Sequence, residues 1–168
     1  MGWMNPRKSD ISEPPSTRRF DSLAQEAFLV LWRTYDRLRI LEDDLFHRFD
    51  ITAQQYNVLR LLRGEHPGRL PTLALASRLV SRAPDITRML DKLAERKFIE
   101  RERLPENRRV VQVGITDNGL ALLKELDTEV RACHQTQLGH LTEDELHQLI
   151  GLLNQARHPH EDGQSVWK

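Results

Sequence analysis

Apolar residues recur at helical spacing along most of this chain, with two β-like runs near its middle. In residues 82–98 they fall at i, i+3, i+4, i+7 and i+8, which predicts a helix with one buried face. That face comprises Ile86, Met89, Leu90, Leu93 and Ala94. A shorter helix is predicted for residues 72–79, and the β-like runs occupy residues 99–104 and 110–115. Two helices joined by a short turn and followed by a hairpin are the outline of a winged helix-turn-helix.

The polar face of the second helix carries residue types that suit the major groove of DNA. Ser81 is the expected N-cap, and Pro84 falls in the first turn, where a missing N–H costs least. An arginine can bond O6 and N7 of guanine, a threonine can contact a base edge or a thymine methyl, and other side chains can reach phosphates. The predicted contacts are Ser81, Arg82, Pro84, Asp85, Thr87, Arg88 and Lys92. The alternative for this helix alone is an ordinary solvated face.

The loop between the β-like runs, residues 105–109, provides a second candidate contact with DNA. Asn107, Arg108 and Arg109 are adjacent there, and two neighbouring arginines at the tip of a β-ribbon can enter a minor groove or bind phosphates. The alternative is a turn that only increases solubility. A polar helix followed by a basic wing, in this order, favours double-stranded DNA as the partner.

The remaining segments predict a helical dimerisation layer. Residues 20–49 form a helix whose apolar stripe is too broad for a small winged helix to cover, so a second copy of the chain is the simplest partner. A supporting helix is predicted from Thr52 to Gly64, where the glycine ends it, with a loop over residues 65–71. Further helices begin after Thr116 and Thr142, and Thr52 and Thr142 each open a capping box.

The expected fold class is therefore mostly α. It is a winged helix-turn-helix with a small β-hairpin wing, and its N- and C-terminal helices form an intertwined helical dimerisation layer. The expected parts are a flexible N-terminal arm (1–19), a dimerisation helix (20–49), the winged helix-turn-helix DNA-binding domain (50–116), dimerisation helices (117–157) and a flexible tail (158–168).

Six short motifs follow one another along the chain: Ile-Thr-x-x-Gln-Tyr-x-Val-Leu (51–59), Leu-Ala-x-Arg-Leu (75–79), Ile-Thr-Arg-Met-Leu-Asp-Lys-Leu (86–93), Ile-Glu-Arg (99–101), the arginine pair at 108–109, and Ile-Thr-Asp-Asn-Gly (115–119). In this order they resemble the MarR family of bacterial and archaeal winged-helix regulators. The resemblance covers roughly residues 20–156. Asn107 stands where the family usually has aspartate. Lys97 stands where the family usually has glycine, at a helix C-terminus that often needs a positive φ, so we expect either a strained Lys97 or a helix that ends differently.

The resemblance implies a homodimer and typically a repressor that releases DNA when a small ligand binds or a cysteine is oxidised. Two recognition helices related by a dyad contact half-sites roughly 34–36 Å apart, so a near-palindromic operator is expected. If the family arrangement holds, Trp32, Tyr35, Phe46 and Tyr56 lie where the dimer helices meet the winged domain. They could line a pocket for a small phenolic or other aromatic effector, or they could simply fill the core. Cys133 lies on an apolar stripe, which favours an inert thiol.

Charge distribution and composition limit which partners and which cellular location are expected. Basic and acidic residues balance at 25 each, but residues 81–113 hold nine basic and six acidic residues, and residues 116–168 hold four and nine. Local basicity attracts phosphate. A single cysteine excludes an internal disulfide framework, and there is no apolar run of membrane length and no apolar segment of the secretory type. We therefore expect a cytoplasmic protein without a membrane partner.

Catalytic and metal-binding motifs are absent from the sequence. It has no Gly-rich phosphate loop, no Gly-x-Ser-x-Gly and no His-Glu-x-x-His, so we expect no enzyme and no cofactor. The group His158, His160 and Glu161 favours a solvated tail over a metal site. The alternative function is a winged-helix protein-interaction module without specific DNA binding. Arg88, Arg108 and Arg109 favour DNA, because such a module does not need all three.

Overall fold

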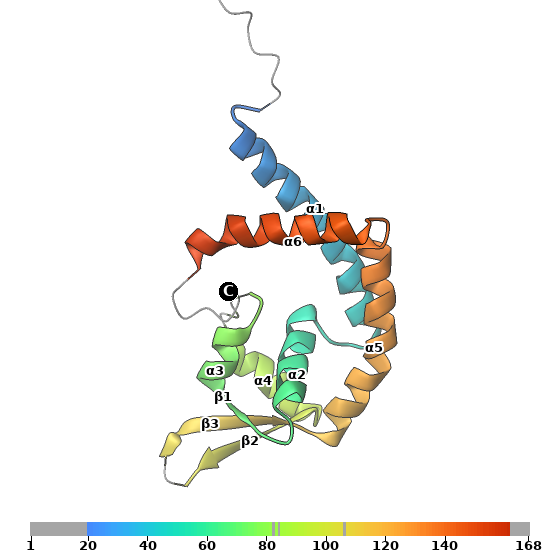
Figure 1. The fold of residues 1–168 in the computed structure, drawn as a ribbon. Helices are drawn as coiled ribbons and strands as arrows, with labels where there is room; N and C mark the ends of the chain where they lie inside the picture. The colour runs from blue at the N-terminus through green and yellow to red at the C-terminus, as the bar shows by residue number, and fades with distance from the viewer. Residues whose placement is uncertain (1–19, 82, 84, 106, 162–168) are drawn as a thin grey trace, which may run out of the picture. The chain divides into compact units, whose positions relative to one another are not determined.

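A mostly helical winged helix-turn-helix is found in the computed structural model, which describes residues 20–81, 83, 85–105 and 107–161. The predicted arm (1–19) and residues 162–168 of the predicted tail lie outside the described part. The chain divides into two compact units, Met1–Arg37 and Leu38–Lys168. The elements, shown in Figure 1, are α1 (Leu23–Arg48), α2 (Ala53–Glu65), β1 (Leu70–Pro71), α3 (Thr72–Arg78), α4 (Ile86–Glu95), β2 (Ile99–Leu104), β3 (Asn107–Ile115), α5 (Asp117–Leu138), α6 (Glu143–Arg157) and the 3-10 turn η1 (His158–His160).

The strands form an antiparallel sheet in the order β1-β3-β2 (Figure 1). The prediction that residues 65–71 form a loop was wrong at both ends. α2 continues through Gly64 to Glu65, and Leu70–Pro71 forms β1, which pairs with Val113 and Gln112 of β3. A strand of two residues is too short to show an alternating pattern. Pro71, which has no N–H, fits this edge position.

The wing strand β3 begins at Asn107, three residues earlier than predicted. Leu104 pairs with Asn107 and Arg103 pairs with Val111, so residues 108–110 fall in an irregularity between the two pairs. The three predicted wing contacts therefore belong to a strand and not to the loop. An irregularity of this kind bends a strand and changes the direction of its side chains. Sequence alternation could not show it, because residues 107–109 are all polar.

The main hydrophobic core lies among α2, α3, α4, the sheet and α5. Its buried residues are Val58, Leu59, Leu62, Leu70, Leu75, Leu79, Leu90, Leu93, Ile99, Val113, Ile115 and Leu123. A second cluster joins the end of α1 to α5 through Leu45, Phe46, Ile51, Leu126 and Val130. Tyr56, Phe98 and Leu122 pack against both clusters. The recognition-helix region and the C-terminal part of α1 are therefore connected through these three side chains.

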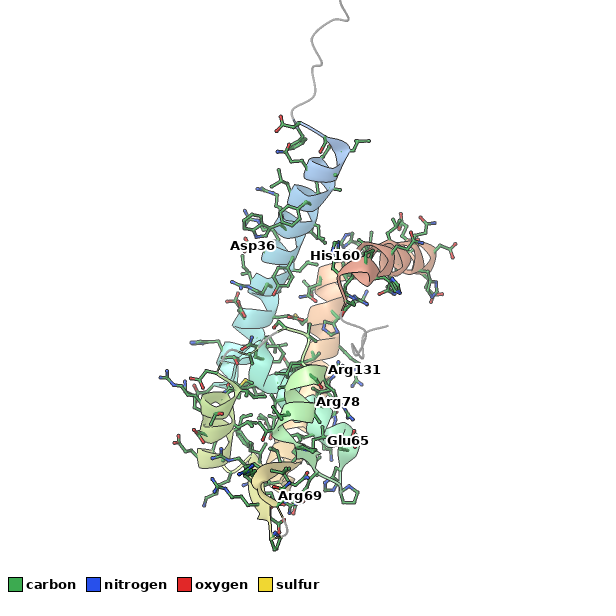
Figure 2. All side chains as sticks on the ribbon, turned by 90° about the vertical axis from the view of Figure 1, so that its left-hand side faces the viewer. Asp36, Glu65, Arg69, Arg78, Arg131 and His160 are labelled. Carbon is green, nitrogen blue, oxygen red and sulfur yellow. The ribbon has the colours of Figure 1, made fainter. Side chains whose placement is uncertain are left out.

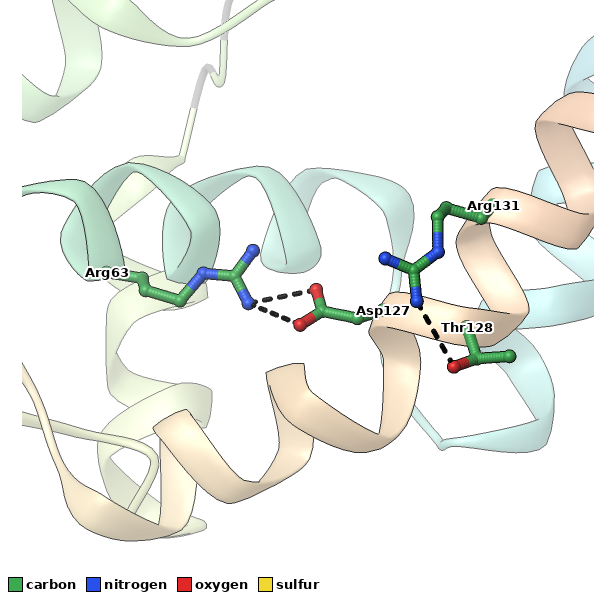
Figure 3. Close-up of polar contacts among 4 residues, drawn as sticks. All are labelled: Arg63, Asp127, Thr128 and Arg131. Atoms are coloured by element: carbon green, nitrogen blue, oxygen red, sulfur yellow. Dashed lines mark hydrogen bonds and ion pairs between the residues drawn. The ribbon is translucent and has the colours of Figure 1, made fainter.

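Ion pairs connect α2 to its neighbours. Arg63 Nη1 donates to both carboxylate oxygens of Asp127 on α5, at 2.9 and 3.1 Å (Figure 3). Arg78 of α3 donates to Glu65 at the end of α2 (Figure 2). The paired side chains are about one-third exposed, and such pairs contribute about 0–1 kcal/mol each. Their effect is therefore mainly on orientation.

The predicted caps in front of α2, α5 and α6 are confirmed. Thr52 Oγ1 accepts the N–H of Gln55, and the Gln55 side chain accepts the N–H of Thr52, at 3.2 and 2.9 Å. Thr142 and Glu145 form the same reciprocal pair before α6, and hydrogen bonds from Thr142 lower the pKa of Glu145. Thr116 Oγ1 accepts the N–H of Gly119 at the start of α5. These contacts span three residues, so the local sequence is sufficient to predict them.

The recognition helix α4 begins at Ile86, later than predicted, and its N-cap is Asp85 and not Ser81. The Asp85 carboxylate accepts the N–H of Arg88 at 3.0 Å. Ser81 lies outside the helix, and its hydroxyl accepts a hydrogen bond from Gln54 at 3.4 Å. Ala83 precedes a proline in the sequence, and that position disfavours the helical conformation. A helix start after Pro84 follows from this constraint.

Of the two alternatives expected at Lys97, the structure shows the strained one, with a positive φ of 60°. The N–H of Lys97 donates to the carbonyl of Ala94, and the N–H of Phe98 donates to the carbonyl of Leu93. These two bonds form a Schellman motif, which usually has glycine at the position of Lys97. A side chain in this left-handed conformation costs stability that glycine avoids.

We predict that Lys97→Gly raises the free energy of unfolding by roughly 0.5–1 kcal/mol, because the strain exceeds the added entropy of the unfolded chain. Urea unfolding at one fixed protein concentration measures it. The control is Lys92→Gly in the same helix, which should lower stability by about 1 kcal/mol. A Lys97→Gly variant less stable than wild type contradicts the prediction.

We also predict that Asp85→Ala lowers the free energy of unfolding by about 1 kcal/mol, because the N–H of Arg88 loses its acceptor. Asp85→Asn retains an acceptor and should be close to wild type. Ser81→Ala serves as the control in thermal unfolding and should have little effect. A larger loss for Ser81→Ala than for Asp85→Ala would show that the helix starts at Ser81 after all.

Candidate nucleic-acid interface

The predicted contact residues of α4 lie on its exposed face. Leu90 and Leu93 are 1% and 0% exposed and form its buried face, while Thr87, Arg88 and Lys92 are exposed. Arg88 and Lys92 lie opposite the buried leucines, so packing of α4 into the core directs them to solvent, while Thr87 lies three residues before Leu90, at the edge of the buried face. Of the other predicted contacts, Asp85 caps the helix and Ser81 precedes it. Arg82 and Pro84 lie outside the described residues.

Basic and acidic side chains of β2 project to opposite faces of the wing. Residues directly opposite each other on paired strands project to the same face, so Arg101 and Arg103 of β2 share a face with Val113 and Val111 of β3. Glu100 and Glu102 of β2 project to the other face by alternation. There Arg69 approaches them, with a nitrogen–oxygen distance of 2.6 Å to Glu100 and 3.6 Å to Glu102.

A short ion pair joins the wing to the recognition helix. Arg101 Nη2 of β2 donates to Asp91 Oδ1 of α4 at 2.6 Å, and its side chain is 32% exposed. The basic face of the wing is therefore the one beside α4. Arg101 was not among the predicted site residues, because its role depends on the pairing register. The Ile-Glu-Arg motif was its only trace in the sequence.

A cavity of about 300 Å³ lies between α4 and the wing. Its lining residues include Thr87 and Leu90 of α4, Arg101 of β2, and Arg109 and Val111 of β3. The structure thus brings two predicted DNA contacts, Thr87 and Arg109, to one recess. Together with Arg88 and Lys92 on the exposed face of α4, they form a polar and basic surface that spans helix and wing.

Asn107 makes a local contact that fits its position at the start of β3. Its Oδ1 accepts the N–H of Arg109 at 3.2 Å. An aspartate could make the same contact, so the neutral amide keeps the hydrogen bond without the negative charge. Asparagine in place of the family's usual aspartate therefore leaves the positive charge of the wing less neutralised. The side chain of Arg108, the third predicted wing residue, lies outside the described part.

The four aromatic residues predicted to bind an effector are divided between the two units. Trp32 and Tyr35 belong to the first unit and are 61% and 60% exposed. Phe46 and Tyr56 belong to the second unit, where their rings stack with centroids 4.7 Å apart. Phe46 is buried, and burial raises the pKa of Tyr56. The latter pair therefore also packs in the core.

The environment of Cys133 is the opposite of what a reactive thiol needs. Burial raises the pKa of the Cys133 thiol, and the nearby carboxylate of Glu42 raises it further. A redox sensor needs a lowered thiol pKa. Among the described residues, no three His, Cys, Asp or Glu side chains group to hold a metal ion. No helix in the described part is both long and apolar enough to span a bilayer.

Comparison with known proteins identifies the family. The model of the MarR family matches residues 51–111. A MarR transcription factor from Planctomyces limnophilus is 58% identical in its crystal structure, with 81% of this chain and 98% of that chain covered and a TM-score of 0.66. A mutant MarR from E. coli, solved in complex with operator DNA, is 27% identical, with coverage of 80% and 98% and a TM-score of 0.70.

The HTH-type transcriptional regulator MhqR of Bacillus subtilis is 26% identical over 129 residues, which are 77% of this chain and 88% of that protein. These relatives are transcription regulators and not enzymes. The order of the described elements is that of a winged helix-turn-helix with a wing beside α4. The chain also covers 98% of a MarR transcription factor with which it is 58% identical, so the fold and the sequence comparison agree. This chain therefore belongs to the MarR family of transcriptional regulators.

Proposed function

We propose that this protein is a homodimeric repressor that binds a near-palindromic operator and releases it when a small molecule binds. The observation that carries the proposal is the single polar and basic surface formed by α4 and the wing. Its two parts are joined by the ion pair between Arg101 and Asp91. A fixed spacing between a helix and a β-ribbon suits simultaneous contact with a major groove and an adjacent minor groove.

Within this surface, the residues have different roles. Arg88 and Thr87 near the start of α4 are the proposed base contacts, because recognition helices read bases with their N-terminal residues. Lys92 is the proposed phosphate contact on α4, and Arg108 and Arg109 of the wing contact phosphates or the minor groove. Ser81, Arg82, Pro84, Asp85 and Asn107 complete the proposed DNA-binding surface. The E. coli relative solved in complex with operator DNA supports DNA as the partner of this surface.

Apolar stripes on α1 and α6 support the homodimer. Phe28, Leu31, Trp32 and Tyr35 recur at i, i+3, i+4 and i+7 on α1 and are 45–61% exposed. No residue of α6 is buried within the described chain, although Ile150, Leu152 and Leu153 are apolar. Exposed apolar patches of this kind mark contact surfaces, and a second copy of the chain is the partner we propose. Dyad-related α4 helices would then contact successive major grooves, which requires a near-palindrome.

Regulation by an effector completes the proposal. An effector can release DNA only if it binds the non-DNA state more tightly. Trp32, Tyr35, Phe46 and Tyr56 remain the proposed contacts for a small phenolic or other aromatic compound. A regulator that acts on chromosomal DNA works in the cytoplasm, which is the location we propose. The interaction-module alternative has no observation that favours it, since such a module does not need a basic surface spanning α4 and wing.

We predict tight, salt-sensitive binding to the DNA upstream of the protein's own coding sequence. Fluorescence anisotropy across a salt series, with a random duplex of the same length, measures affinity and preference. Arg88→Ala should reduce the ratio of the affinities for the upstream and random duplexes by about tenfold or more, because a base contact is lost. Arg109→Ala should weaken both by similar factors and reduce the salt slope by about one.

The matched control for these variants is Arg69→Ala. Arg69 is also an arginine beside the sheet, but it pairs with the acidic face of the wing, so binding to both duplexes should be unchanged. If wild type prefers no duplex at low salt, the DNA-binding proposal fails in favour of the interaction module. Equal losses for Arg69→Ala and Arg109→Ala would reject the assignment of the wing faces.

We predict that Leu31→Glu weakens dimerisation by more than about tenfold, because it places an unpaired charge in an apolar contact. Sedimentation velocity over a range of protein concentrations measures the dissociation constant. Leu73→Glu is the control, since Leu73 is an 85% exposed leucine on α3, away from α1 and α6 in the sequence. A monomeric wild type at micromolar concentration, or a Leu31→Glu variant that dimerises normally, rejects the proposed interface.

A further inference from the structure

The C-terminal ends of α1 and α4 have the same backbone motif. At the end of α1, Asp50 has a φ of 54°, its N–H donates to the carbonyl of His47, and the N–H of Ile51 donates to the carbonyl of Phe46. At the end of α4, Lys97 has the corresponding left-handed conformation. A Schellman motif satisfies some carbonyls of the last turn but leaves those of the capping residues open. The carbonyls of Phe49 and Asp50 are in that position.

One side chain joins these two helix ends. Arg96 is the C-cap of α4, and its Nη1 donates to the Asp50 carbonyl while its Nη2 donates to the Phe49 carbonyl at 3.4 Å. The guanidinium also lies 4.7 Å from the centre of the Phe98 ring. A positive charge is favourable at a helix C-terminus, where the dipole is negative. Arg96 therefore supplies the cap of α1 from the end of the recognition helix.

The same end of α4 also contacts the start of α5. Thr116 Oγ1 donates to the Lys97 carbonyl at 2.6 Å, and the N–H of Thr116 donates to the Phe98 carbonyl at 3.1 Å. Thr116 is itself the N-cap of α5. A Cβ on Gly119 would overlap the Phe98 carbonyl oxygen, so α5 approaches this segment closely. Residues 96–98 thus lie in direct contact with the ends of two long helices.

The α1 contact is more specific to arginine than an ion pair would be. The Asp50 carboxylate is 3.7 Å from Arg96 Nη1 and its side chain is 94% exposed, so the charge interaction between them is weak. The acceptors that matter are two backbone carbonyls, which a planar guanidinium can reach with two nitrogens. A lysine ammonium has a single nitrogen and cannot reproduce this fork.

We propose that Arg96 is a positioning residue for DNA recognition: by capping α1 from the end of α4, it fixes the recognition helix relative to the end of α1. The inference rests on the proposed function, in which α1 belongs to the dimer layer and α4 reads DNA. In a dimer, the spacing of the two α4 helices must match one helical turn of DNA. A looser joint between α1 and α4 costs specific binding, which needs that spacing, more than non-specific binding, which needs only charge.

The test compares Arg96→Lys, Arg96→Met and, as control, Asp50→Asn, using the upstream duplex and the random duplex described above. Both Arg96 variants should bind the upstream duplex about tenfold more weakly, equivalent to about 1.4 kcal/mol. Their binding to the random duplex and its salt slope should be unchanged. Asp50→Asn keeps both carbonyl acceptors and should match wild type. General destabilisation would instead lower binding to both duplexes together.

Two results would overturn the proposal. If Arg96→Lys binds as wild type while Arg96→Met loses affinity for both duplexes and about one unit of salt slope, Arg96 is a phosphate contact. If Asp50→Asn reproduces the loss seen in Arg96→Lys, the exposed ion pair and not the backbone cap is responsible. In each case the role assigned to the carbonyls of Phe49 and Asp50 is wrong.

Amide hydrogen exchange of the DNA-free protein separates this inference from the proposed function. In Arg96→Lys, exchange should quicken in peptides covering residues 46–51 and 93–98 and stay unchanged in α2. If wild type shows no DNA preference, the proposed function fails, but local quickening still supports the joint between α1 and α4. Exchange equal to wild type at both helix ends overturns the joint whatever the DNA result.

Discussion

The burial of one face of α4 is the constraint on which the rest of the structure depends. Leu90 and Leu93 are almost completely buried in the main core, and each buried leucine contributes about 1.5–3 kcal/mol. Several such side chains from α2, α3, the sheet and α5 share that core, so α4 cannot rotate without exposing them. Arg88 and Lys92, on the opposite side of α4, are exposed as a consequence. The DNA-binding surface is therefore set by apolar packing on its opposite side.

Polar contacts then fix the neighbours of α4 with little effect on stability. The pair between Arg101 and Asp91 orients the wing, while Arg69 neutralises the acidic face that points away from α4. These side chains are partly exposed, so each pair contributes about 0–1 kcal/mol. Their value lies in sorting the charge of a chain whose net charge is zero. A basic surface forms beside the recognition helix because Glu100 and Glu102, the acidic residues of the described part of the wing, project to its other face.

The sequence was sufficient wherever the deciding contact is local. Thr52, Thr116 and Thr142 cap helices through hydrogen bonds that span three residues. The left-handed conformation of Lys97 was expected only from the family resemblance, because glycine usually occupies that position. The errors concern competing or distant partners. Ser81 and Asp85 are both good N-cap residues, and only a proline between them favoured the second. The start of β3 depends on pairing with β2, which no periodicity among polar residues reveals.

The roles of Arg96 and Arg101 were beyond sequence reasoning for the same reason. Arg101 pairs with Asp91, which lies ten residues earlier, before the turn into β2. Arg96 donates to the carbonyls of Asp50 and Phe49, which lie 46 and 47 residues before it in the chain. Both look like ordinary surface arginines in the sequence. The candidate effector residues illustrate the complementary case. The family arrangement and their aromatic type identified them, but their stacking and burial depend on tertiary packing, as Phe46 and Tyr56 show.

The most direct experiment is selection of duplexes from a random pool by the purified protein. It tests whether α4 and the wing of two copies, related by a two-fold axis, bind a specific DNA sequence. Sequencing of the retained duplexes identifies the preferred site directly, with no operator assumed. Two α4 helices related by a dyad should select an inverted repeat whose half-site centres are roughly 10–10.5 base pairs apart. Failure to enrich any sequence, or enrichment of a single half-site without symmetry, would contradict it.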